Sequence, residues 1–392
     1  METSRYVVVG AGLAGAATAL SLARAGHEVT VVERTSPAAH DGSSHGSARI
    51  FRYAYPDAFY TDLVVRSKAL WDDLETAGGR RLITPTGAVD FGVPRQPAAL
   101  ARVLDAAGVE HELLGPAEAR SRWPGIAVDT DVLWHPAAGV IDAEVAVRTM
   151  LDLAVRHGAR LLTHWPVRRV LRSGSGYVLV SGTGERLSAE RVVASVGGWL
   201  PELLADLPLP SAFVDRLPAL TVRQEQAFHF PYRDLRPDDD PGAQRAPWPT
   251  FIHKSPDIQV YGLPGGRDAA HRGQKVAQYN GGRALRSAAD QDGVVSDANR
   301  QRVVAYVERY LPGLVPEPYA ETTCLFTSTP TEDFLVDGTD GITLLSPCSG
   351  HGAKFAPLIG DLAAGVATGA SAPPDRFRVG RSLTMEGVPV GA

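Results

Sequence analysis

The sequence predicts an α/β protein that begins with a βαβ unit and contains a second, strand-rich region. Tyr6 to Val9 is a run rich in β-branched residues, typical of a strand buried on both faces. Apolar residues then repeat at helical spacing from Leu13 to Ala23, and Val29 to Val32 forms a second apolar run. Alternating segments between Ala219 and Thr327 predict a long antiparallel sheet later in the chain.

A glycine-rich turn joins the first predicted strand to the first predicted helix. It carries the pattern Gly-x-Gly-x-x-Gly at Gly10, Gly12 and Gly15, and Glu33 ends the next strand 18 residues later. The first glycine allows a tight turn, the second lets the backbone approach a pyrophosphate, and the third lets helix and strand pack closely. The helix N-terminus favours a diphosphate, and Glu33 can accept hydrogen bonds from a ribose. The unit predicts a Rossmann-like dinucleotide site, but the motif alone does not separate FAD from NAD.

Periodicity and turn residues predict further elements. Helices are expected at Thr61 to Ala77, Asp142 to His157 with Asp142 as N-cap, Ser296 to Tyr310, and Ala353 to Thr368. Strands are expected at Leu161 to Leu162, Val167 to Leu171, Tyr177 to Val180, Arg191 to Val196, Thr221 to Phe230, Asp257 to Tyr261 and Ile342 to Leu345. The stretch from Tyr232 to Pro249 is rich in proline and charge, and we interpret it as a surface loop.

Composition excludes several classes of protein. A length of 392 residues suggests two to three domains, and 44% hydrophobic with 21% charged residues excludes global disorder. The net charge of −5, with no basic cluster, argues against a nucleic-acid or membrane partner. The longest apolar stretch is too short to span a membrane, and the N-terminus leaves no room for a signal peptide. Two cysteines, Cys324 and Cys348, form neither a disulfide framework nor a metal motif, so we expect a cytoplasmic protein with no metal site.

Three blocks of sequence carry a resemblance to a known family. They are GSSHGSARIFRYAY at residues 42–55, CLFTSTPTEDF at residues 324–334 and SGHGAKF at residues 349–355. Together they resemble the monomeric sarcosine oxidase and N-methyltryptophan oxidase family of flavoproteins, which is similar in fold to D-amino acid oxidase. The resemblance extends to about Arg381 and is weakest from Arg216 to Tyr319. It implies a Rossmann-like FAD-binding domain of the glutathione-reductase type (residues 1–90, 141–213 and 326–392), interleaved with an antiparallel-sheet substrate domain (residues 91–140 and 214–325).

The resemblance also implies how FAD is held. In such enzymes a cysteine binds the flavin covalently at its 8α-methyl position, and Cys324 matches that cysteine. A thiolate has the nucleophilicity that this bond requires. Cys348 is the second candidate, and a buried structural cysteine is the alternative for Cys324. The residues expected to bind the cofactor are Gly10, Gly12, Gly15, Glu33, Arg34, Ser44, His45, Arg49, Val167, Cys324, Gly350, His351, Gly352 and Lys354.

By the same resemblance, Arg52 and Lys354 bind the substrate carboxylate. A guanidinium suits a bidentate contact and an ammonium supplies a point charge. Lys354 would lie in the first turn of a helix, where the dipole disfavours a cation, so a role other than helix support is indicated. The alternative for Arg52 is a surface position or one beside the diphosphate. His45 and Arg49 either lie near the flavin face or neutralise the phosphates.

The family further places a lysine near the flavin to promote the reaction with oxygen. Lys275 fits this position, and Lys254 remains open because the alignment needs an insertion. A cation there stabilises superoxide as it forms. Tyr261 matches a tyrosine of the substrate pocket.

Three positions depart from the family pattern. Tyr279 stands where the family often has histidine, Phe326 where sarcosine oxidases tend to have tyrosine, and Ala353 where a bulky phenylalanine is frequent. These departures predict a pocket with a different volume and fewer polar groups than a sarcosine site.

The expected function is an FAD-dependent oxidase of a secondary, N-alkyl or cyclic amino (imino) acid. Hydride passes to the flavin, and the products are an imine and hydrogen peroxide. The partners are the amine substrate and molecular oxygen, and we expect a monomer or weak dimer. Alternatives are an oxidase that tailors a natural-product precursor, an FAD dehydrogenase that passes electrons to a partner protein, and a flavin-binding scaffold. A nicotinamide enzyme is disfavoured because nothing outside the first unit supports it.

Overall fold

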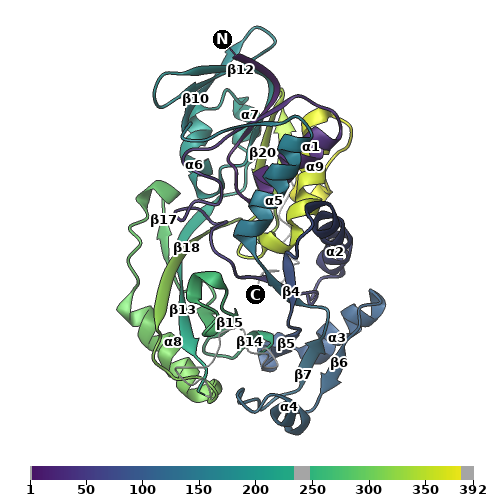
Figure 1. Cartoon of the computed structure of the whole chain (residues 1–392), viewed down its shortest axis with the longest axis vertical. Helices are drawn as coiled ribbons and strands as arrows, with labels where there is room; N and C mark the ends of the chain where they lie inside the picture. Colours follow the sequence, from purple (N-terminus) through teal and green to yellow (C-terminus); the bar gives the residue numbers. More distant parts are fainter. Residues whose placement is uncertain (1, 234–247, 381–392) are drawn as a thin grey trace.

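The computed structural model describes residues 2–233 and 248–380, which form two lobes (Figure 1). Most of the loop expected at residues 232–249 therefore lies outside the described residues. The helices are α1 (Leu13–Arg24), α2 (Ala58–Gly78), α3 (Pro97–Ala106), α4 (Pro116–Arg122), α5 (Ala143–Arg156), α6 (Leu200–Leu203), α7 (Ser211–Val214), α8 (Asp297–Tyr310) and α9 (Ala356–Thr368). In this part of the chain, no helix combines the length and apolar character that a membrane crossing needs.

The first lobe is built on an eight-stranded sheet. Its strands are β1 (Glu2–Val9), β2 (Val29–Val32), β9 (Arg160–Leu162), β10 (Val167–Ser173), β11 (Gly176–Ser181), β12 (Arg186–Ala194), β19 (Leu335–Thr339) and β20 (Ile342–Ser346). The parallel part runs β9-β2-β1-β12-β20, and antiparallel pairs β10-β11 and β19-β20 extend it. The hairpin expected between β10 and β11 is present.

Both faces of the parallel strands are covered, which explains their continuous apolar runs. Val8 and Val31 belong to the core shared with α1, α5 and α9. Val7 and Val9 belong to a second core that contains residues of α6 and α7. Figure 1 shows α1, α5 and α9 side by side next to this sheet, in agreement with their mutual contacts.

The second lobe holds a nine-stranded sheet. Its strands are β5 (Ala88–Phe91), β6 (Glu112–Leu114), β7 (Val132–His135), β13 (Thr221–Pro231), β14 (Thr250–Lys254), β15 (Gln259–Pro264), β16 (Gly273–Gln278), β17 (Arg283–Leu285) and β18 (Ala320–Ser328). A third, three-stranded sheet is formed by β3 (Arg49–Phe51), β4 (Ile83–Pro85) and β8 (Gly139–Ile141). The expected antiparallel arrangement is correct except between β5 and β14, which pair in parallel.

The two faces of the second sheet differ in chemistry. Phe228 and Phe230 of β13 pack in a core with Val303 and Val307 of α8. Successive residues of a strand point to opposite faces, so Glu225 and His229 lie on the other face. Directly opposite residues of paired strands share a face, and this rule adds Cys324, which pairs with Glu225, and Lys275, which pairs with His229. The same face also carries Tyr261 of β15.

Three expected boundaries shift for local reasons. Helix α2 begins at Ala58 because Asp57 caps it, accepting a hydrogen bond from Phe59 N at 2.9 Å. Strand β15 begins at Gln259 because Ser255 and Ile258 close a turn before it. The last helix begins at Ala356, after a 3₁₀ turn over Gly352–Phe355. The sequence predicts Lys354 in the first turn of the helix, and this placement is wrong. Lys354 lies in the 3₁₀ turn that precedes the helix.

The division into an FAD-binding and a substrate domain remains a proposal. The sequence places one boundary at residue 90, inside β5, and another at residue 325, inside β18. Strand β18 pairs along nearly the whole of β13. We therefore propose that β5 and β18, the two strands that these boundaries divide, belong entirely to the substrate domain.

Candidate active site

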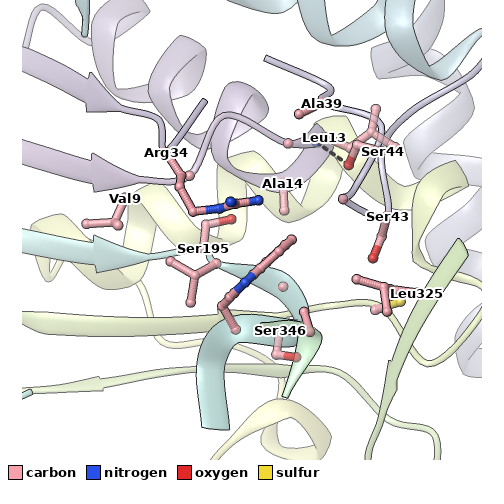
Figure 2. Close-up of a pocket in the computed structure, with 18 of the residues that line it drawn as sticks. Val9, Leu13, Ala14, Arg34, Ala39, Ser43, Ser44, Ser195, Leu325 and Ser346 are labelled. Carbon is pink, nitrogen blue, oxygen red and sulfur yellow. Dashed lines mark hydrogen bonds between the residues drawn. The ribbon is translucent and has the colours of Figure 1, made fainter. Parts of the chain in front are cut away.

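A large cavity of about 660 Å³ lies beside the first strands of the parallel sheet. Its lining includes the glycine turn, the ends of β2, β12 and β20, and residues 41–44. Figure 2 shows Ser43 and Ser44 across this cavity from Arg34. Nine of the residues expected to bind the cofactor line it, and they are Gly10, Gly12, Glu33, Arg34, Ser44, Arg49, Val167, Gly350 and Gly352.

The glycine turn leaves a space that the side chains of other residue types would occupy. A Cβ atom at Gly12 would lie 2.9 Å from the Ser44 hydroxyl oxygen, on the lining of the cavity. Gly10 has a φ of +100°, and a Cβ there would lie 2.4 Å from the carbonyl oxygen of Ser195. Gly15 does not line the cavity, and its Cβ would lie 2.0 Å from the Gly10 oxygen. The third glycine thus permits close packing of helix and strand.

Polar groups converge on this space. Leu13 N donates to Ser44 Oγ at 3.0 Å (Figure 2). Glu33 Oε2 accepts from Ala11 N at 2.7 Å, so the carboxylate at the end of β2 is fixed against the turn. Arg34 lies over the ring of Trp199, with its guanidinium carbon 4.5 Å from the centroid. The cavity wall therefore has an acidic group, a basic group and the N-terminus of α1.

Arg49 and His45 have different surroundings. The Arg49 guanidinium donates to Ser43 O and Ala48 O, both at 2.9 Å, and lines the large cavity. His45 does not line this cavity and bonds Gly42 O through Nδ1 at 2.6 Å. Burial, with a smaller effect of Arg49, lowers the pKa of His45 to about 3. A neutral His45 supports the loop over residues 42–45, beneath the cavity wall.

A family model for FAD dependent oxidoreductases matches residues 5–365. The chain belongs to this family. N-methyl-L-tryptophan oxidase from Yersinia pestis (strain Pestoides F) is 30% identical over 372 residues, which cover 91% of this chain and 93% of that protein. The resemblance drawn from the sequence is thereby confirmed, and the cofactor is FAD.

Solved structures confirm the predicted fold class. NikD, described as an unusual amino acid oxidase essential for nikkomycin biosynthesis, superposes with a TM-score of 0.81 at 23% identity. The match covers 97% of this chain and 98% of that one. L-proline dehydrogenase from P. horikoshii matches with a TM-score of 0.77 at 20% identity, over 95% of each chain.

The residues of the large cavity fit FAD. Its volume lies within the usual range for cofactor sites, about 300–1,000 Å³. Gly12, which lines the cavity without a side chain, and the N-terminus of α1 suit the diphosphate, and Glu33 suits a ribose. We refer to it below as the FAD cavity.

A small cavity of about 90 Å³ adjoins the FAD cavity. The two share Arg49, Phe326, Gly350 and Ala353 in their linings. A Cβ at Gly350 would lie 2.8 Å from the Phe326 ring and 3.0 Å from the Tyr279 ring, so this glycine lets both rings close over the junction. The small cavity therefore lies where a substrate would meet the cofactor.

Arg52 and Lys354 both line the small cavity, and both side chains are buried. The Lys354 ammonium donates to Tyr55 Oη at 3.0 Å and to His351 O at 2.7 Å. Arg52 lies over the same Tyr55 ring, with its guanidinium carbon 4.5 Å from the centroid, and donates to Ala54 O. Burial, followed by the nearby Arg52 charge, holds the pKa of Lys354 well below its usual range.

Tyr55 also connects this pair to His351. The hydroxyl lies 3.0 Å from His351 Nδ1, and His351 Nε2 lies 3.1 Å from Glu332 O. A carbonyl oxygen can only accept, so Nε2 carries the proton and Nδ1 accepts from Tyr55. The Tyr55 oxygen then accepts from Lys354, so hydrogen bonds connect Lys354 through Tyr55 and His351 to Glu332 O. The sequence assigned no role to Tyr55, although it lies in the block that carries the resemblance.

Lys275 and Cys324 lie together at the other part of the small cavity. Burial and the nearby Arg49 lower the pKa of Lys275 to about 8. Burial raises the pKa of the Cys324 thiol, and Lys275 and Arg49 act in the opposite direction. Tyr261, from the neighbouring strand β15, also lines this cavity. The sequence-predicted residues Arg52, Tyr261, Lys275, Cys324, His351 and Lys354 are thus brought together around one space.

The two alternative residues occupy distinct places. Cys348 lines the FAD cavity but not the small cavity, and burial raises the pKa of its thiol. Lys254 lines the small cavity, and burial, followed by Arg95 and Arg52, lowers its pKa to about 8.

A buried charged network supports the small cavity, and the sequence analysis missed it. Asp90 accepts from Arg95 Nε at 2.6 Å and lies 3.0 Å from His135 Nε2. Arg95 also donates to Ala54 O at 3.0 Å, the same carbonyl that Arg52 contacts. Burial alone would raise the pKa of Asp90, but Arg95 and His135 reverse this and hold it below its usual range. Asp90 is an isolated acid in the apolar sequence of β5, and this signal could have identified the network.

Glu225 is a second group that the sequence analysis missed. It lies opposite Cys324, and its Oε2 accepts from Gly282 N at 3.1 Å. Within the described residues, Oε1 has no partner. Burial raises the pKa of Glu225 to about 7.

Proposed function

We propose that the protein is an FAD-dependent oxidase of a secondary, N-alkyl or cyclic amino acid. The observation that carries this proposal is the pair of buried cations, Arg52 and Lys354, lining one small cavity next to the FAD cavity. When bound, FAD accepts a hydride from the carbon beside the amine nitrogen and leaves an imine, and oxygen then restores the cofactor with release of hydrogen peroxide.

Arg52 and Lys354 bind the substrate carboxylate in this proposal. Lys354 is held by Tyr55 and by His351 O, so its ammonium is positioned before the substrate arrives. Arg52 has free N–H donors beyond its bond to Ala54 O. A carboxylate between them would offset the mutual repulsion of two buried cations.

The same positive charge favours a neutral amine. None of the aspartates or glutamates in the described residues lines the small cavity. Nearby cations lower the pKa of a bound amine, because they disfavour a further positive charge. A neutral secondary amine carries the lone pair that drives hydride loss, so the proposal needs no side-chain base.

Lys275 is proposed to promote the reaction with oxygen. It is buried, and among the described residues it has no hydrogen-bond or ion-pair partner. An unpaired ammonium beside the cofactor stabilises negative charge that develops on oxygen. Lys254 is the alternative for this step.

Covalent attachment through Cys324 is also proposed. Burial raises the pKa of the Cys324 thiol, and the cations Lys275 and Arg49 oppose this rise and so support thiolate formation. Cys348 remains the alternative.

One screen tests the central proposal. Purified protein is given N-methyl, cyclic and primary amino acids, each beside an amine of the same shape that lacks the carboxylate, and hydrogen peroxide release is measured. We expect turnover of secondary and cyclic amino acids only. Oxidation of the amines without carboxylates at equal rates would contradict the carboxylate site. Fast anaerobic reduction with slow reoxidation by oxygen would identify a dehydrogenase that serves a partner protein.

A further inference from the structure

Five cationic side chains line the small cavity, and they are Arg49, Arg52, Lys254, Lys275 and Lys354. No carboxylate from the described residues lines it. The proposed function uses four of these cations. Arg52 and Lys354 take one carboxylate, Lys275 serves oxygen, and Arg49 is fixed to Ser43 O at the junction with the FAD cavity. Lys254 is left without a role of its own, because it enters the proposed function only as the alternative to Lys275.

Lys254 is the last residue of β14 and pairs with Gln259 of β15. Both side chains line the small cavity, so an ammonium and an amide lie next to each other on its wall. Among the described residues, the Lys254 ammonium has no hydrogen-bond or ion-pair partner. Its charged neighbours are mainly Arg95 and Arg52, which repel it.

Two acids act on Lys254, and neither lines the small cavity. Asp90 is bonded to Arg95 and lies against His135. Glu332 Oε1 accepts from the Tyr279 hydroxyl at 2.7 Å, and among the described residues Glu332 Oε2 has no hydrogen-bond partner. Burial, followed by Arg95 and Arg52, lowers the pKa of Lys254 to about 8, and the two carboxylates offset only part of this effect. A partly buried ammonium without an anion is unfavourable, so stability does not explain this residue.

We propose that Lys254, with Gln259 beside it, binds a second acidic group of the substrate. The substrate class is then an N-substituted amino acid that carries two carboxylates. This inference rests on the proposed function for the first carboxylate and extends it to a second one. An anion at Lys254 would balance a charge that a substrate with a single carboxylate leaves uncompensated.

The test compares acids with their uncharged amides. The pairs are N-methylaspartate with N-methylasparagine, N-methylglutamate with N-methylglutamine, and N-(carboxymethyl)glycine with its monoamide. Each amide has nearly the shape of its acid but lacks the second charge. We expect kcat/KM in the unmodified enzyme to favour at least one acid over its amide about tenfold to 100-fold, the range for a charged hydrogen bond.

The variant Lys254→Met should remove this preference. We expect it to lower kcat/KM for the preferred acid about tenfold to 100-fold and to change the amide less than about threefold. Lys254→Arg should retain part of the preference. Lys68→Met is the matched control, because Lys68 pairs with Asp72 on α2 and does not line the small cavity.

A binding measurement separates this inference from the proposed function. Glutarate and butyrate are titrated against the FAD-loaded protein, and the change in flavin absorbance is followed. We expect tighter binding of glutarate, lost in Lys254→Met. This result would support the second acidic site even if no amine were oxidised.

Three outcomes would overturn the inference. The first is equal kcat/KM for all acids and amides. The second is an equal loss for acids and amides in Lys254→Met, which would place Lys254 at the first carboxylate. The third is a slower reoxidation by oxygen in Lys254→Met with the acid preference intact, which would make Lys254 the oxygen-reactive lysine.

Discussion

The two adjoining cavities are built in different ways. The FAD cavity begins with a contiguous turn and uses backbone groups, including those of Gly12 and of the N-terminus of α1. The small cavity uses side chains of β14, β15, β16 and β18, together with Arg52 and the turn that holds Lys354. Backbone recognition can thus be encoded in a short segment, whereas the substrate site depends on how distant segments assemble.

The cavities also differ in charge. The FAD cavity includes Glu33, Asp41, Glu202 and Asp206 among its lining residues, in addition to arginines. The small cavity has cations without acids among the described residues. This difference suits a cofactor with both hydroxyl and phosphate groups on one side, and an anionic substrate on the other.

The covalent link between the protein and the flavin is tested first, and its expected effect is all or none. Cys324→Ala should release the flavin or fail to acquire it, whereas Cys348→Ala should retain it, because the cations Lys275 and Arg49 oppose the rise that burial causes in the pKa of the Cys324 thiol. The measurement is the yellow colour of the acid-precipitated protein. A colourless pellet from the unmodified protein would contradict covalent attachment while leaving FAD binding intact.

The buried network beneath the small cavity should be costly to break. Asp90→Asn removes the buried carboxylate that pairs with Arg95 and His135, and we expect the free energy of unfolding to fall by about 3–5 kcal/mol, measured by urea denaturation. Glu112→Gln is the control, since the Glu112–Arg122 pair lies at the surface and should contribute at most about 1 kcal/mol. Equal, small losses in both variants would mean that Asp90 does not support the cavity.

Lys275 distinguishes the oxygen step from substrate binding. Lys275→Met should slow reoxidation by about 10²–10³-fold and leave anaerobic reduction largely intact, because only the oxygen step develops superoxide charge. Stopped-flow absorbance of the flavin measures both steps. Normal reoxidation in Lys275→Met together with a collapse in Lys254→Met would reverse the assignment of the two lysines.

Lys275 should also make the rate of reoxidation depend on pH. The pKa of Lys275 is about 8, so the side chain is a cation below that pH and loses its charge above it. Reoxidation should therefore slow as the pH rises through about 8, and this limb should disappear in Lys275→Met. A limb of the opposite sign would show that the neutral amine is the active form.

Sequence reasoning reached the FAD cavity more fully than the small cavity. Gly10, Gly12 and Glu33 could be placed from spacing alone, because one βαβ unit holds them all. Asp142 was also predicted correctly as the N-cap of α5, where it accepts from Val145 N at 3.0 Å. These features depend on local chain geometry.

The connections within the small cavity could not be predicted in this way. Tyr55 bonds Lys354 across 299 residues of sequence, and Asp90 meets His135 across 45. Their burial depends on tertiary packing, which periodicity does not reveal. Arg52 and Lys354 were found only through the family resemblance. The parallel pairing of β5 with β14 was missed for the same reason.

Substitutions at the proposed carboxylate site test whether the positive charge of the small cavity binds the substrate. Arg52→Gln or Lys354→Met should weaken transition-state binding by about 2–4 kcal/mol, the range for breaking a desolvated charged hydrogen bond. The measurement is kcat/KM with a cyclic amino acid such as proline or pipecolate. Circular dichroism controls for folding, and Lys354→Arg should recover part of the activity. Unchanged kcat/KM in both variants would exclude these residues from the carboxylate site.

The junction of the two cavities should determine which substrate sizes the enzyme prefers. This prediction has the smallest expected effect on kcat/KM. Ala353 lines both cavities, where related enzymes often carry phenylalanine, so the unmodified enzyme should prefer a ring amino acid or a larger N-substituted amino acid to sarcosine. Ala353→Phe should lower kcat/KM for pipecolate relative to sarcosine by about tenfold, because the added ring occupies space that the larger substrate needs. Ala353→Val is an intermediate control and should give a smaller shift in the same direction. A preference for sarcosine in the unmodified enzyme, unchanged in Ala353→Phe, would mean that Phe326 and Tyr279, rather than residue 353, limit the space at the junction.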